Sequence, residues 1–389
     1  MVVSQIIGPF GNLAMPPTDI AAKPRNRPYT AAHRLLELGR KRFSFAALVL
    51  FISCAAHAQA DVQEPIRLQI IGGLAGVTQY TKIEQPFWQS GIEALSGGKI
   101  SATIRPLNGG GLRSQEMLQL MRLGVVTFGT AILSDVEGEV PELNAVDLPA
   151  LNPDVATLRQ SVDAFREHLR ELLRDRFGIE LLGVYVYPAQ VLFCAKPFKG
   201  LDDLAGRKVR TSSVGQSEMM AALGALPTIL PFAQITAALR DGIADCAITG
   251  TLSGYEIGLP NVSTTVHTFA ISWGVSIFGA NVAYWNSLPA DARGIIRHGV
   301  TQLEEKIWSQ AQADTELGLA CDAGKATCSL GKPERPMTVV PTSAADKERR
   351  RKLLTDVVLP HWFARCGPDC VASWNTYLKP IHDIEAKAP

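Results

Sequence analysis

The chain has 389 residues, of which 47% are hydrophobic and 19% are charged, and its formal net charge is +1 at pH 7. This length and composition are typical of a globular protein with two domains of ordinary size. The near-zero net charge argues against nucleic acid or anionic lipid as the main partner. No internal apolar run reaches the ~18 residues that a membrane-spanning helix needs.

Residues 1–60 predict an N-terminal extension followed by a signal peptide. The basic segment GRKR precedes the apolar run FSFAALVLFIS and the small-residue segment CAAHAQA. This order is typical of a secretory signal with cleavage near Ala58 or Ala60, and a lipoprotein signal at Cys54 is the alternative. We therefore expect a periplasmic protein that does not itself span the membrane after signal cleavage.

The segment 61–187 predicts a first α/β lobe. A strand at 65–71 precedes the glycine-rich turn GGLAGVTQ, which brings Thr78 and Gln79 toward a cleft. The glycine spacing in this turn is not G-x-G-x-x-G, so the turn does not indicate a dinucleotide site.

Two further strands of this lobe are followed by polar candidates for ligand binding. The strand at 100–105 leads into a glycine loop that contains Asn108, and the apolar strand at 125–132 ends just before Ser134. Open α/β sheets bind ligands beyond the carboxyl ends of their strands, which is where these residues fall.

The segment 188–274 predicts a second lobe, which the chain enters through apolar strands at 179–187 and 190–195. Short apolar strands here alternate with helices of about ten residues, which makes a parallel sheet the expected arrangement.

Arg210 is the strongest candidate for a binding residue in this second lobe. It ends a short strand, and Ser212 and Ser213 follow at the start of a helix. A guanidinium group beside free helical N–H groups favours binding of an anion, most naturally a carboxylate.

Residues 275–310 are expected to return and complete the first lobe. An apolar stripe begins at Ile296 and has spacings of four, three, four and four residues (Ile296, Val300, Leu303, Ile307 and Ala311). The stripe predicts one long helix at 289–320 that spans both lobes. Residues 321–389 predict a helical, cysteine-bearing C-terminal section.

Six cysteines remain after the signal peptide, namely Cys194, Cys246, Cys321, Cys328, Cys366 and Cys370. An even number in an oxidising compartment favours disulfides. The short spacings predict local bridges between Cys321 and Cys328 and between Cys366 and Cys370, whereas the pairing of Cys194 and Cys246 stays open. Zinc is the competing use of such residues, but no C-x-x-C motif is present, and we expect neither a metal nor a cofactor.

The segments GLDDLAGRKVR (200–210), GALPTILPFAQITAALRDGIADCA (224–247) and NVAYWNSLPADARGII (281–296) resemble the substrate receptors of TRAP (tripartite ATP-independent periplasmic) transporters, of the dicarboxylate-receptor type. The resemblance covers roughly residues 66–310. It implies a two-lobed periplasmic-binding-protein fold of the α/β class, with a ligand cleft between the lobes. It also implies a receptor that binds a small carboxylate, has no catalytic activity and delivers its ligand to TRAP membrane permease subunits. The carboxylate-holding arginine of the family falls on Arg210.

The sequence departs from the family pattern at two expected binding positions. Gln190 lies where many members have a second arginine, and Thr249 or a neighbour lies where many have an amide or an acid. Trp273 adds an aromatic side to the expected pocket. A monocarboxylate is therefore as compatible with these residues as a dicarboxylate.

Two other functional classes remain open from the sequence. An exported enzyme is one of them, although no G-x-S-x-G or HExxH motif occurs. A ligand-sensing module built on the same fold is the other, because a fold does not determine its use.

Overall fold

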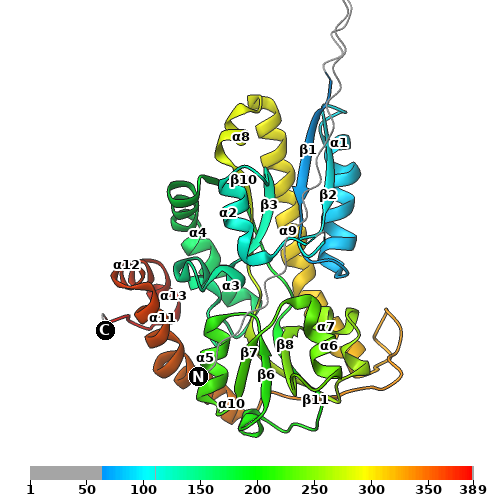
Figure 1. Ribbon diagram of the computed structural model, residues 1–389, viewed down its shortest axis with the longest axis vertical. Helices are drawn as coiled ribbons and strands as arrows, with labels where there is room; N and C mark the ends of the chain where they lie inside the picture. Colours follow the sequence, from blue (N-terminus) through cyan, green and yellow to red (C-terminus); the bar gives the residue numbers. More distant parts are fainter. Residues whose placement is uncertain (1–63, 110, 388–389) are drawn as a thin grey trace, which may run out of the picture. The chain divides into compact units, whose positions relative to one another are not determined.

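The computed structural model describes residues 64–109 and 111–387. The expected leader and its cleavage sites at Ala58 and Ala60 lie outside the described residues. The described residues form two mixed β-sheets with helices around them (Figure 1). The predicted fold class, two α/β lobes with one long helix, is confirmed.

The first sheet has the strand order β2-β1-β3-β10-β4. The strands β1 (Ile66–Ile71), β2 (Ile100–Arg105) and β3 (Phe128–Ile132) are parallel, and β10 (Ser276–Asn281) runs antiparallel between β3 and β4 (Ile179–Tyr185). The strand β10 therefore lies in the interior of this sheet, although it comes much later in the chain than the four other strands.

Five α-helices accompany the first sheet, and two of them, α4 and α8, begin at a side chain that caps the helix. The longest is α4, where the Asp154 side chain accepts a hydrogen bond from the Thr157 backbone N–H (2.8 Å) and Gly178 ends the helix with φ +59°. The helices are α1 (Ile92–Leu95), α2 (Met117–Arg122), α3 (Leu133–Val136), α4 (Val155–Phe177) and α8 (Val282–Ser287).

The second sheet has the strand order β11-β9-β5-β8-β6-β7. The expected parallel arrangement is found for β6, β7 and β8, but it is wrong for β5, which runs antiparallel to both β8 and β9. The reason is that β5 and β9 carry the chain between the sheets in opposite directions. The elements are β5 (Gln190–Cys194), β6 (Lys208–Thr211), β7 (Leu226–Ile229), β8 (Cys246–Gly250), β9 (Thr265–Ser272), β11 (Thr338–Val340), α5 (Val214–Ala222), α6 (Ile235–Arg240) and α7 (Thr251–Glu256).

Two short segments carry the chain between the sheets, from β4 to β5 at 186–189 and from β9 to β10 at 273–275, and the chain passes between them a third time after β10 to reach β11. The carboxylate of Asp147 fixes the second crossing. Its Oδ1 accepts a hydrogen bond from the N–H of Trp273 (2.8 Å), and its Oδ2 accepts from Gly274 (2.7 Å) and Val275 (3.1 Å). Three consecutive backbone donors that leave a β-ladder are thereby satisfied by one side chain.

The predicted long helix is α9 (Ala290–Asp322), which has 33 residues and a length of about 50 Å. It contacts β4 of the first sheet and α7 beside the second (Figure 1). The Trp308 indole N–H donates to the Val184 carbonyl (2.8 Å), and the Thr315 hydroxyl accepts from the Ala189 N–H (3.1 Å). Gly318 lets α9 approach α7, because a Cβ there would lie 2.3 Å from the Leu252 nitrogen.

The C-terminal section adds β11 to the second sheet and then continues as helices that pack on α4 and α5. The structure joins Cys321 to Cys328, Cys366 to Cys370, and Cys194 to Cys246. The last pair, left open by the sequence, is explained by strand register, because Cys194 of β5 lies directly opposite Cys246 of β8. The helices are α10 (Ala344–Leu353), α11 (Leu359–Cys366), α12 (Pro368–Ser373) and α13 (Lys379–His382).

Replacing Asp147 with alanine should destabilise the protein by about 3 kcal/mol, because it removes the acceptor of three backbone N–H groups and each buried orphan costs about 1–3 kcal/mol. Chemical denaturation followed by circular dichroism measures this. Asp163→Ala, which removes an exposed carboxylate from α4, is the control and should cost less than about 1 kcal/mol. Equal effects of the two substitutions would show that the crossing does not depend on Asp147.

Candidate functional site

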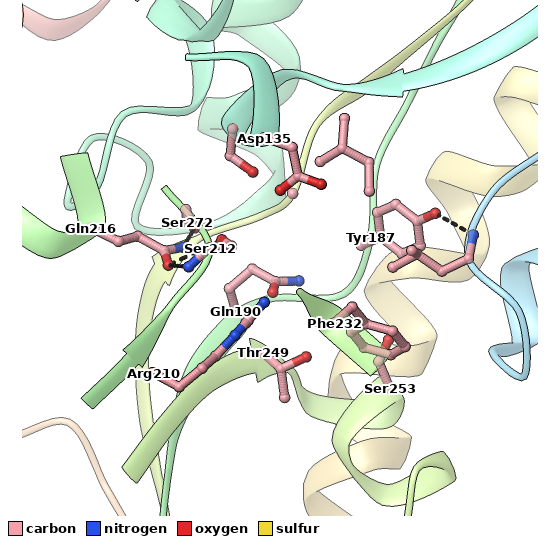
Figure 2. Close-up of a pocket in the computed structure, with 14 residues that line it drawn as sticks. Asp135, Tyr187, Gln190, Arg210, Ser212, Gln216, Phe232, Thr249, Ser253 and Ser272 are labelled. Atoms are coloured by element: carbon pink, nitrogen blue, oxygen red, sulfur yellow. Dashed lines mark hydrogen bonds between the residues drawn. The ribbon is translucent and has the colours of Figure 1, made fainter. Parts of the chain in front are cut away.

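A cavity lies where the crossings meet the carboxyl ends of β3, β6 and β8 (Figure 2). Its volume is about 50 Å³, which is room for a small molecule only. Five of the residues expected from the sequence line it, namely Ser134, Gln190, Arg210, Ser212 and Thr249. The structure thus brings together candidates that are as much as 115 residues apart (134 to 249) in the sequence.

Arg210 is nearly completely buried, and the backbone fixes its orientation. Its Nε donates to the Leu230 carbonyl (2.8 Å) and its Nη1 donates to the Ile248 carbonyl (2.7 Å). Nη2, and the second hydrogen of Nη1, have no hydrogen-bond partner among the described residues, and Figure 2 shows the guanidinium group directed into the cavity. Three N–H bonds of the guanidinium therefore remain, and two of them can bind a carboxylate in the bidentate manner.

Burial lowers the pKa of Arg210 to about 10, and the nearby Asp135 opposes this shift. Even at that pKa the guanidinium is charged at neutral pH. Asp135 forms no ion pair with Arg210, and a buried cation without a paired counter-charge is unfavourable, so the site gains stability when an anion binds directly to the guanidinium.

One wall of the cavity is a hydrogen-bonded set of three polar side chains. The Gln216 carbonyl oxygen accepts from the Ser212 N–H (2.9 Å) and hydroxyl (3.1 Å), and its amide donates to the Ser272 hydroxyl (3.0 Å). This set joins the start of α5 to the end of β9. Gly274 lies next to it with φ +70°, and a Cβ there would be 3.3 Å from the Gln190 amide nitrogen.

The N-terminus of α5 does not offer the free N–H groups that the sequence led us to expect. The Gly215 N–H donates to the Glu137 carboxylate (3.1 Å), and the Gln216 N–H donates to the Ser213 hydroxyl oxygen (3.1 Å). Glu137 is fully buried and also pairs with Arg365 (2.7 Å). The chain supplies its own anion at this helix end, so Arg210 is left as the anion-binding group of the cavity.

The opposite wall comes from the first lobe and contains Asp135 and Tyr187. Burial raises the pKa of Asp135, and the nearby Ser114 hydroxyl and Arg210 partly oppose the rise. The Tyr187 hydroxyl oxygen accepts from the Leu74 N–H (3.1 Å). Behind it, burial raises the pKa of Glu84 to about 7, although the Gln79 amide and the Gly73 N–H donate to it.

Four residues expected in the site lie outside the cavity lining. Thr78 donates through its N–H (3.1 Å) and its hydroxyl to Glu256, and the Gln79 amide donates to Glu84. The other two support the backbone: Asn108 accepts from the Ala75 N–H (2.7 Å), and the Trp273 indole N–H donates to the Asn152 carbonyl (3.1 Å). These four side chains are engaged in holding the fold.

Sequence reasoning missed several lining residues, including Asp135, Tyr187, Gln216, Phe232 and Ser272. Two of them were one position away from a residue that we named, since Asp135 follows Ser134 and Ser272 precedes Trp273. Ser272 ends β9, and side chains of an extended strand alternate between its two faces, whereas Ser134 and Asp135 lie in α3 and both line the cavity. The alternation pattern could have found Ser272.

The chain has no grouping that suits a metal in the part that the structure describes, where no cluster of three or more His, Cys, Asp or Glu side chains could hold an ion. The cysteines that could have bound zinc are joined in disulfides instead.

Comparison with known proteins matches residues 75–334, more than half of the chain, to the family model for bacterial extracellular solute-binding protein, family 7. A solute-binding protein of Albidiferax ferrireducens is 26% identical over 230 residues, which are 57% of this chain and 67% of that protein.

Solved structures share the fold. DctP7 of Bordetella pertussis, described as an extracytoplasmic solute receptor binding pyroglutamic acid, has a TM-score of 0.71 at 21% identity, with 80% of this chain and 99% of that chain covered. A TRAP periplasmic solute-binding protein of Sulfurospirillum deleyianum with bound succinate has a TM-score of 0.69 at 20% identity, with 80% and 99% covered.

Arg210→Ala should weaken binding of a carboxylate by two to four powers of ten. Removing one partner of a buried charge pair costs about 3–5 kcal/mol, and each decade of affinity is worth about 1.4 kcal/mol. Arg210→Lys should not restore binding, because an ammonium group cannot replace the planar fork. Gln190→Ala should cost only about 1 kcal/mol, the value of a neutral hydrogen bond.

Calorimetric titration of the folded variants, with the acid that the wild type retains, measures these losses. Arg240→Ala is the matched control, because Arg240 is exposed and pairs with its neighbour Asp241. If Arg210→Ala binds as tightly as this control, Arg210 is not the carboxylate site.

Proposed function

This chain belongs to family 7 of the bacterial extracellular solute-binding proteins, and we propose that it holds a small organic acid by its carboxylate at Arg210. Members of this family are extracytoplasmic receptors and not enzymes, so the exported-enzyme hypothesis is set aside. We further propose that the receptor delivers its ligand to the membrane permease subunits of a TRAP transporter.

The observation that carries the proposal is the state of the Arg210 guanidinium. It is buried, two backbone carbonyls fix it, and Figure 2 shows it directed into the cavity. Of the polar side chains around it, Ser212, Gln216 and Ser272 are hydrogen-bonded to one another. A carboxylate supplies acceptors for the remaining N–H bonds and a negative charge in direct contact with the guanidinium.

The ligands of structurally similar proteins support the same class of ligand. Pyroglutamate is the ligand of the Bordetella receptor and succinate that of the Sulfurospirillum protein, and both are carboxylates. Delivery to a permease is supported by the receptor family itself. In the described ranges, moreover, the structure has no helix that is long and apolar enough to cross a membrane.

The division into lobes is also a proposal. We propose that residues 61–187, completed by 275–310, and residues 188–274 act as the two bodies on either side of the cavity, with α9 along both. The positions of the crossings at 186–189 and 273–275 support these boundaries.

Mass spectrometry of the natively purified mature protein tests the function. After denaturation, the protein should release a small organic acid in near-stoichiometric amount, or it should bind such an acid in calorimetry once stripped. Release of a neutral or cationic compound, or turnover of a bound acid, would contradict the proposal.

Export is tested by the N-terminus of the protein recovered from a periplasmic fraction. The signal pattern predicts that the mature chain begins at Gln59 or Asp61, because signal peptidase cleaves after small residues in the arrangement A-x-A. N-terminal sequencing gives the answer directly. A full-length chain found in the cytoplasm would refute this prediction.

A further inference from the structure

The cavity contains a carboxyl group as well as a guanidinium group. Of the residues that line it, Arg210 and Asp135 are the two whose side chains ordinarily carry charge at neutral pH. Figure 2 shows them on opposite sides of the cavity, with both side chains directed into it. Their formal charges cancel, so the ionisable part of the lining has no net charge.

Asp135 and Arg210 face each other without a direct contact. The ion pairs within 4.0 Å that the structure describes do not include one between them. Each nevertheless shifts the pKa of the other, so their charges interact across the empty space. That space is where a ligand would lie.

The position of Asp135 is fixed from both sides. At the start of α3, the Leu133 N–H donates to the Val275 carbonyl (2.9 Å), which ties α3 to the second crossing. Just beyond its end, Glu137 is held by the Gly215 N–H and by Arg365. These contacts hold in place the backbone that carries Asp135.

A ligand carboxylate bound to Arg210 would neutralise the charge that opposes the rise in the pKa of Asp135. A desolvated carboxylate without a partner is unfavourable, so Asp135 would then need either a hydrogen-bond donor or a proton. A ligand that also carries an N–H donor would satisfy the ionised Asp135, whereas a second carboxylate beside it could bind only if Asp135 took up a proton.

We propose that Asp135 is a specificity-determining residue, which makes the cavity prefer small monocarboxylates that also carry an N–H donor. Dicarboxylates, and acids of the same size without such a donor, are disfavoured. The inference rests on the proposed function, because it takes Arg210 as the group that holds the carboxylate.

Two matched pairs of acids test this preference by calorimetric titration of ligand-stripped wild-type protein. Proline and cyclopentanecarboxylate have the same ring, but only proline carries an N–H donor. Pyroglutamate and succinate compare a lactam N–H with a second carboxylate. We expect the donor-bearing acid of each pair to bind about ten- to a hundred-fold more tightly, the usual value of a hydrogen bond to a charged group.

Asp135→Asn should reduce the preference for proline over cyclopentanecarboxylate at least ten-fold, because it removes the negative charge and keeps the shape. Asp135→Leu should lower it further by removing the acceptor as well. Asp163→Asn, on the exposed face of α4, is the control and should leave the preference unchanged. Thermal unfolding of each variant shows that it is folded.

The outcomes separate this inference from the proposed function. If Arg210→Ala abolishes binding of every acid while Asp135→Asn keeps the wild-type ranking, the inference fails and the proposed function stands. If Arg210→Ala binds normally, the proposed function fails. Should the Asp135 variants not fold, the wild-type panel decides: tighter binding of succinate or cyclopentanecarboxylate, or binding of neither donor-bearing acid, overturns the inference.

Discussion

The site depends on one constraint, the two short segments at 186–189 and 273–275 that carry the chain between the sheets. The strands on either side of the crossings are neighbours in both sheets, β4 with β10 and β5 with β9. Of the cavity lining, Tyr187 lies in the first crossing and Gln190 directly after it, and Ser272 lies directly before the second crossing and Gly274 within it. The three N–H groups that leave the ladder at 273–275 need an acceptor, and the Asp147 carboxylate supplies it. The cavity is the space left where the backbone changes sheets.

Within that space, the electrostatics follow from how Arg210 is held. The backbone carbonyls of Leu230 and Ile248 fix the guanidinium, and they carry no charge that would neutralise it. The Glu137 carboxylate is bound to the start of α5 and to Arg365. Asp135 is near enough to act on Arg210 but does not pair with it. Arg210 therefore remains a buried cation that can bind an anionic ligand.

The C-terminal section contributes to the site although it lies mostly beyond the family match, which ends at residue 334. Arg365 of α11 pairs with Glu137 next to α3 and with Glu218 of α5. These contacts hold together the two elements that bear Asp135 and the Ser212–Gln216 wall. The Trp362 indole N–H also donates to the carbonyl of Pro141 (2.8 Å), the first residue of the segment Pro141–Asp147 that ends with the carboxylate at the second crossing. The C-terminal section thus binds residues of both lobes close to the elements that line the cavity.

The sequence by itself determined the fold class, the family, the long helix and Arg210, because these depend on local periodicity and on motifs read along the chain. The apolar stripe of α9 and the strand that contains Arg210 are complete within short segments. Only the tertiary structure decided which other side chains lie near the guanidinium. Ser272 ends β9 and lines the cavity, whereas Trp273, the first residue of the crossing, is buried and donates to the Asn152 carbonyl. The roles of Asp135, and of Glu137 at the start of α5, depend on interactions between residues about 75 positions apart, which no local pattern encodes.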